Sequence, residues 1–187
     1  MLLRHLQQVR REIALPAGRR GSLALRHVDA GSCNGCEHEL AATANPYYDL
    51  QRHGLNIVAS PRHADVLLVT GPITTRMADP LRRAYEAMPE PRLVAALGDC
   101  AVGCAVGHAA GCTAGPAAGC TVGHAVLADP AQLAGPLEEI LPVDLRIPGC
   151  PPNPSQIAEA LLGLMHETAQ HPTARRARNS SSRDTHT

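Results

Sequence analysis

The chain has 187 residues, a formal net charge of zero and 44% apolar residues, which is enough for one ordinary domain with its own core. Phe and Trp are absent, so the core must be built from Leu, Val, Ile and Ala. All 17 basic residues are arginine. No apolar run approaches the roughly 18 residues that cross a bilayer. Arg10-Arg11 is followed by too short an apolar stretch for an export signal, so we expect a cytoplasmic protein.

The charges are unevenly placed along the chain. Residues 1–30 carry six Arg against two acids, residues 171–187 carry four Arg against one acid, and the residues between them have a net charge of −7. Basic ends around an acidic body indicate arms that contact a partner or an anionic membrane surface, and solvated tails explain the pattern equally well. We expect no nucleic-acid partner.

The hydrophobic pattern predicts three segments. Residues 1–20 read as an amphipathic arm, residues 21–170 as one α/β domain, and residues 171–187 as a disordered basic tail without large apolar side chains. Within the domain, short apolar runs predict strands at Ser22–Val28, Leu55–Ala59, Val66–Thr70, Arg92–Leu97 and Val143–Ile147. Helices are expected at Glu37–Thr43, Asp79–Met88 and Gln156–Thr168, with Ser155 as the cap of the last one.

Strands that alternate with helices favour a doubly wound, mostly parallel sheet with helices on both faces. In such sheets, functional sites form in the loops that follow the carboxyl ends of strands. Cys33 and Cys36 follow the first predicted strand, Cys100 follows the fourth, and Cys150 follows the fifth. We therefore expect three strand-end loops to converge on one centre.

Four cysteines arranged in this way are typical of metal or redox chemistry in a reducing compartment. The C-x-x-C pair lets one turn supply two thiolates, and Cys100 and Cys150 complete the four-cysteine set that an iron–sulfur cube requires. The same ligands suit structural zinc, and a C-x-x-C pair also serves as a redox dithiol. Spacing alone does not separate these three interpretations.

Four separated segments then resemble one family in the same order. They are Arg26–Thr43, Val69–Thr74, Gly98–Ala101 and Leu141–Asn153. The family contains the small subunits of membrane-bound (group 4) [NiFe] hydrogenases and formate hydrogenlyases, together with the 20 kDa subunit of respiratory complex I. The resemblance covers roughly residues 22–168 and implies a flavodoxin-like fold with one [4Fe–4S] cluster on Cys33, Cys36, Cys100 and Cys150.

The resemblance also implies partners and a role. It implies an electron-transfer subunit that works with a large catalytic subunit, a ferredoxin-like iron–sulfur subunit and membrane subunits, at the inner face of the cell membrane. Complex I subunits typically have adjacent cysteines where this chain has Cys33-Asn34-Gly35-Cys36, so the spacing favours the hydrogenase branch. A quinone-coupled, complex I-like subunit and a zinc-stabilised interaction module remain alternatives. Of the carboxylates after the pair, Glu39 is a stronger candidate than Glu37 for proton handling, and a surface carboxylate is the simpler interpretation.

Residues 103–126 depart from the family pattern. They contain three copies of the octad Gly-Cys-x-x-Gly-(His/Pro)-Ala-x, which lengthens the segment between Cys100 and Cys150. Tandem duplication in a tolerant surface loop explains this regularity better than a second metal site does. Such a site would use Cys104, Cys112, Cys120, His108 and His124 as its ligands.

Overall fold

The computed structural model describes residues 21–103 and 130–170. The predicted arm, most of the octad repeat and the predicted basic tail lie outside these residues. The strands are β1 (Leu23–Asp29), β2 (Leu55–Ile57), β3 (Val66–Thr70), β4 (Ile73–Thr74), β5 (Leu93–Leu97), β6 (Leu133–Gly135) and β7 (Leu145–Ile147). The α-helices are α2 (Gly35–Ala42), α3 (Thr75–Glu86), α5 (Leu137–Ile140) and α6 (Pro154–Gln170). Short 3-10 turns lie at η1 (Leu50–His53), η2 (Pro61–His63) and η4 (Pro130–Gln132).

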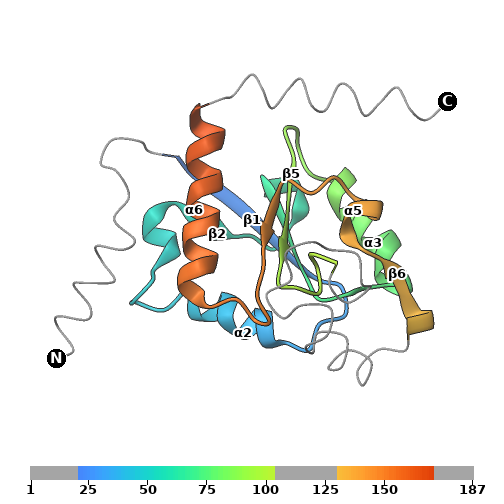
Figure 1. Ribbon diagram of the computed structural model, residues 1–187. Coiled ribbons are helices and arrows are strands. Elements are labelled where there is room, and N and C mark those ends of the chain that lie inside the picture. Colours follow the sequence, from blue (N-terminus) through green and yellow to red (C-terminus); the bar gives the residue numbers. More distant parts are fainter. Residues whose placement is uncertain (1–20, 104–129, 171–187) are drawn as a thin grey trace.

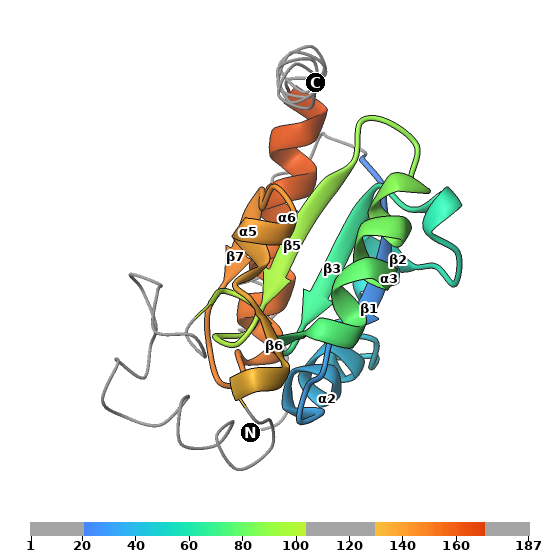
Figure 2. The same ribbon diagram turned by 90° about the vertical axis from the view of Figure 1, so that its right-hand side faces the viewer.

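Five strands form one parallel sheet in the order β2-β1-β3-β5-β7. Figure 1 shows α6 on one side of this sheet and α3 with α5 on the other, which confirms the predicted α/β class with helices on both faces. All five carboxyl ends lie at the same edge, and the arrowheads of β3 and β5 point toward the end of the molecule where α2 lies (Figure 2). The loops after the strands therefore share that edge.

The core has two layers because neighbouring residues of a strand point to opposite faces. On β3, Val66 and Leu68 pack in the layer that contains α2 and α6, while Leu67 and Val69 pack in the layer that contains α3 and α5. Every residue of β3 and β5 is buried. This explains why both strands are continuous apolar runs in the sequence, a pattern typical of strands covered on both faces.

Two aspartates fix the amino ends of the sheet. The Asp65 side chain precedes β3 and accepts a hydrogen bond from the Ala24 N–H of β1 at 2.9 Å. In the same way, the Asp144 side chain precedes β7 and accepts from the Val94 N–H of β5 at 2.9 Å. Each carboxylate satisfies a backbone donor at a strand start, where the neighbouring strand offers no carbonyl.

The sequence misplaced several boundaries and missed a second sheet. Helix α3 begins at Thr75, four residues before the predicted start, because Thr74 in extended conformation leads directly from β4 into the helix. Strands β4 and β6 form a separate antiparallel pair.

The predicted cap of the last helix was also wrong. The cap is Asn153, not Ser155: the Asn153 side chain accepts from the Gln156 N–H at 2.9 Å, and the Gln156 side chain accepts from the Asn153 N–H at 3.0 Å. This reciprocal arrangement is a capping box, and it places the start of the helix at Pro154.

Candidate functional site: three loops around Cys36

The four predicted ligand cysteines all lie beyond the carboxyl ends of sheet strands. Cys33 follows β1 and Cys36 lies in the first turn of α2, whereas Cys100 and Cys150 lie in the loops after β5 and β7. Cys36 and Cys100 are buried, and Cys33 and Cys150 are exposed. The site thus has two thiols against the protein interior and two at the surface.

The turn with Cys33 and Cys36 rests on the loop after β5. Gly98 adopts a φ of +87°, and a Cβ atom at this position would overlap the Cys36 sulfur. The backbone of Gly98 therefore lies directly against that sulfur. A larger residue would be strained in this left-handed conformation and would also displace the thiol.

The loop after β7 contacts the same turn. Pro151 lies 3.9 Å from the position that a Cβ atom on Gly35 would take, and the Cys33 sulfur lies 3.5 Å from it. Burial raises the pKa of the Cys36 thiol to about 12, and the charges of Glu37, Cys33, Cys150 and Asp99 add to this rise. Cys33 and Cys150 therefore both lie within electrostatic range of Cys36.

Asp99 ties the loop after β5 to the loop after β7. Its backbone N–H donates to the Gly149 carbonyl at 2.8 Å, and its Oδ1 accepts from the Gly149 N–H at 2.7 Å. The Gly98 N–H donates to the Ile147 carbonyl at 2.8 Å. Because the Asp99 side chain is fully buried, these bonds are shielded from water. They hold the backbone next to Cys100 against the backbone next to Cys150.

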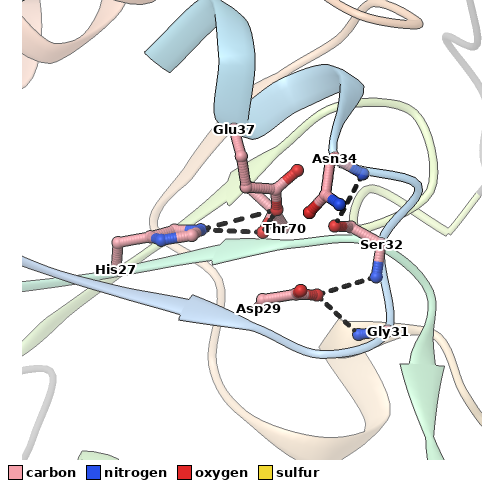
Figure 3. Close-up of polar contacts among 7 residues, drawn as sticks. All are labelled: His27, Asp29, Gly31, Ser32, Asn34, Glu37 and Thr70. Carbon is pink, nitrogen blue, oxygen red and sulfur yellow. Dashed lines mark hydrogen bonds and ion pairs between the residues drawn. The ribbon is translucent and has the colours of Figure 1, made fainter. Parts of the chain in front are cut away.

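Asp29 shapes the chain that leads into Cys33. Its Oδ1 accepts from the N–H groups of Gly31 at 2.8 Å and Ser32 at 2.7 Å, and the Ser32 hydroxyl accepts from the Asn34 N–H at 3.1 Å (Figure 3). Partial burial alone would raise the pKa of Asp29, but the N–H groups of Ser32 and Gly31 outweigh it and lower the pKa below its ordinary value. The carboxylate therefore remains ionised and keeps the turn closed.

A second polar group links α2 to the sheet next to Cys36. The Thr70 hydroxyl, at the end of β3, donates to Glu37 Oε1, and His27 Nε2 of β1 lies 2.8 Å from the Thr70 oxygen and 3.6 Å from Glu37 Oε1 (Figure 3). Burial lowers the pKa of His27, and this effect outweighs the opposing charges of Glu37 and Asp29. His27 is therefore neutral near pH 7.

Not every predicted residue joins this group. Glu39 is partly exposed on α2, and its side chain makes no hydrogen bond with another described residue. Across residues 21–103 and 130–170, no three His, Cys, Asp or Glu side chains are gathered closely enough to bind a single metal ion. The ligands of the possible second metal site, Cys104 to His124, lie outside the described residues.

The sequence reasoning missed His27, Thr70 and Asp99 as parts of the site. Thr70 and Asp99 each lie at or just beyond the carboxyl end of a buried strand, which is the signal that could have identified them. His27 carries a weaker signal. It is two residues from Leu25 on β1 and so shares the face that packs against α2.

Comparison with known proteins identifies the family of the chain. Residues 33–164, which begin at the first predicted ligand cysteine, match the family of the NADH ubiquinone oxidoreductase 20 kDa subunit. The chain belongs to this family. As the resemblance of the four segments led us to expect, its relatives are subunits of hydrogenases and of NADH-quinone oxidoreductases.

Two relatives and one solved structure illustrate the range of the family. A probable membrane-bound hydrogenase subunit of Pyrococcus furiosus is 38% identical over 144 residues, which cover 77% of this chain and 74% of that protein. The B subunit of the NADH-quinone oxidoreductase of Desulfovibrio desulfuricans is 36% identical over 129 residues, which cover 69% and 59%. A chain of a membrane-bound sulfane sulfur reductase, an archaeal respiratory membrane complex, is 27% identical with a TM-score of 0.60, and the match covers 83% and 75%.

Membership of the 20 kDa subunit family fixes the general role of the chain. The family belongs to oxidoreductase complexes, so the chain is of the type that serves as one subunit of such an assembly. The family binds an iron–sulfur cluster, and its members work with partner subunits. None of the described helices is long and apolar enough to cross a membrane.

Proposed function

We propose that the chain is the electron-transfer subunit of a membrane-associated hydrogenase and that Cys33, Cys36, Cys100 and Cys150 bind one [4Fe–4S] cluster. It would relay electrons between the active site of a large catalytic subunit and a ferredoxin-like subunit. The observation that carries this proposal is the contact of three loops around Cys36. Gly98 lies against its sulfur and Pro151 lies beside the same turn, so ligands that are far apart in the sequence share one edge of the sheet.

The donor set fits such a cluster. Four thiolates are the ligands that a [4Fe–4S] cube requires. Four thiolates on one zinc ion would stand only about 3.8 Å apart, given Zn–S bonds of about 2.3 Å, and no three such side chains are gathered closely enough for one metal ion among the described residues. When bound, the cluster supplies one-electron transfer. The chain would hold it with two buried and two exposed cysteines. A positive metal centre also offsets the burial that otherwise keeps the Cys36 thiol protonated.

The partners follow from the relatives. The hydrogenase assignment rests on the Cys33-Asn34-Gly35-Cys36 spacing and on the similarity to the Pyrococcus protein. The similarity to the Desulfovibrio oxidoreductase favours the alternative of a complex I-like subunit that passes electrons to a quinone. In either case the chain would lie on the cytoplasmic side of the membrane and be held there by the other subunits. Hydrogen would reduce the cluster in the first complex, and a quinone would exchange electrons with the cluster in the second.

The proposal is tested on the full chain, produced and purified without oxygen. We expect four iron and four acid-labile sulfide per chain, and an electron paramagnetic resonance signal after reduction with dithionite. Cys36→Ser should lose both iron and signal, while Ser155→Ala, a change at the start of α6, should keep them. A chain that contains stoichiometric zinc and no sulfide would show that the zinc-stabilised interaction module is correct.

Glu39 is the proposed proton-handling residue. In the assembled complex, Glu39→Gln removes the proton-carrying group from a partly exposed site, so we expect turnover to fall roughly 100-fold, the lower end of the usual contribution of a general acid or base. Iron content, subunit assembly and the rate of cluster reduction by dithionite serve as controls, because they should not change. Unchanged turnover would mean that Glu39 is an ordinary surface carboxylate.

A further inference from the structure

The Glu37 carboxylate is held against the sheet although it follows Cys36 directly in the chain. Its Oε1 accepts the hydrogen bond from Thr70, while its Oε2 is buried and has no hydrogen-bond partner among the described residues. Burying an unpaired carboxylate oxygen is unfavourable. A side chain on the first turn of a surface helix could turn outward into water, so the contacts with the sheet are what keep it inside.

The direction of the hydrogen bonds follows from their chemistry. A carboxylate only accepts, so the single hydroxyl proton of Thr70 goes to Glu37. The Thr70 oxygen is then free to accept, and its partner at 2.8 Å is His27 Nε2. A neutral His27 must therefore carry its proton on Nε2. The hydrogen bonds thus run in series, from His27 to Thr70 and from Thr70 to Glu37, and each group orients the next.

We propose that His27 and Thr70 are positioning residues that fix the Glu37 carboxylate beside the Cys36 ligand, and that its negative charge lowers the reduction potential of the cluster. The inference rests on the proposed function, since it needs a cluster on Cys36. Reduction adds one electron to the oxidised core with its four thiolates. A fixed negative charge nearby opposes that electron and favours the oxidised form.

The expected size follows from Coulomb's law. In a partly buried site with an effective dielectric constant of about 20, one charge several ångströms away changes a one-electron equilibrium by roughly tenfold. A tenfold change in the ratio of reduced to oxidised cluster corresponds to about 59 mV for a one-electron couple. Because the Glu37 side chain is mostly buried, added salt should screen this effect only weakly.

The experiment is a redox titration of the full chain with its cluster, followed by electron paramagnetic resonance. Glu37→Gln keeps the shape of the side chain and removes its charge. At a fixed ambient potential we expect the ratio of reduced to oxidised cluster to rise roughly tenfold. The matched control is Glu86→Gln, which removes one exposed carboxylate at the far end of α3, near the amino ends of the strands. Equal potentials for Glu37→Gln and Glu86→Gln would overturn the inference.

Thr70 separates positioning from simple packing. Thr70→Val keeps the branched shape but cannot donate to Glu37, so the potential should rise toward that of Glu37→Gln. Thr70→Ser keeps the hydroxyl and should restore the original potential. Equal shifts in Thr70→Val and Thr70→Ser, or no shift in Thr70→Val, would contradict the positioning role. If Glu37→Gln does not retain a cluster, the difference in potential between Thr70→Val and Thr70→Ser tests the inference instead.

The same titration distinguishes the two proposals. A wild-type chain without iron, sulfide or signal would refute the proposed function itself. If the wild-type chain has a normal cluster and its potential is unchanged by the substitutions at Glu37 and Thr70, only the positioning role of His27 and Thr70 and the electrostatic role of Glu37 are refuted.

Discussion

Gly98→Ala should abolish cluster binding while the domain stays folded. At a φ of +87° an alanine is strained by about 1–3 kcal/mol, and its Cβ would overlap the Cys36 sulfur. The backbone of Gly98 cannot retreat easily, because its N–H is bonded to the Ile147 carbonyl of the neighbouring strand. The sulfur of Cys36 must therefore move, and a displaced ligand no longer matches the other three.

Iron and sulfide content, measured together with far-ultraviolet circular dichroism, check this expectation. The control is Gly163→Ala on α6, where an added Cβ meets no atom within 4 Å. Alanine in a helix interior is favoured over glycine by about 1 kcal/mol, so this variant should be slightly more stable and keep all its iron. A Gly98→Ala chain with the iron content of wild type would contradict the view that this glycine makes room for the thiol.

Asp99→Ala should both destabilise the domain and lose the cluster. The change leaves the buried N–H of Gly149 without its acceptor, and an unsatisfied buried donor costs about 1–3 kcal/mol. It also removes one of the three hydrogen bonds described above between the loop that carries Cys100 and the loop that carries Cys150, so the two loops are held together less firmly. Urea unfolding of the cluster-free chain measures the first effect, and iron content after anaerobic reconstitution measures the second.

Asp99→Asn is the informative control for that experiment. An asparagine oxygen can still accept from the Gly149 N–H, so most of the stability and most of the iron should remain. If Asp99→Asn fails as completely as Asp99→Ala, the carboxylate matters for another reason than the link to Gly149. If Asp99→Ala keeps full iron content, the two loops are held together by their backbone bonds alone.

The parallel sheet was predictable from the sequence because burial on both faces leaves a simple pattern. Val66–Thr70 is predicted and observed with the same bounds, and β5 differs from its prediction by one residue. The second sheet was not predictable. Ile73–Thr74 and Leu133–Gly135 are two and three residues long, and their pairing joins segments about 60 residues apart. Such short strands carry no periodicity that a local pattern can reveal.

The candidate site, like the fold, was predictable from the sequence only in part. The rule that sites form after the carboxyl ends of parallel strands led to the four cysteine positions from residue type and strand order alone. The contacts around them join residues 33 to 50 positions apart, as in Thr70 with Glu37 and Gly149 with Asp99. These contacts depend on loop conformation and side-chain direction, which strand patterns do not encode. For this reason the sequence favours Glu39 over Glu37, although the Glu37 side chain is the one bonded to the sheet.

The one-to-one pairing of β3 with β5 has a consequence for how this chain can change length during evolution. Val66 to Thr70 align with Leu93 to Leu97 without a gap, and β7 pairs with β5 in register as well. One extra residue within either strand would advance the following loop by about 3.3 Å and reverse its inward and outward side chains. Residues added between Gly103 and Pro130 alter neither register, so that stretch can grow by duplication while the anchors of Cys100 and Cys150 stay in place.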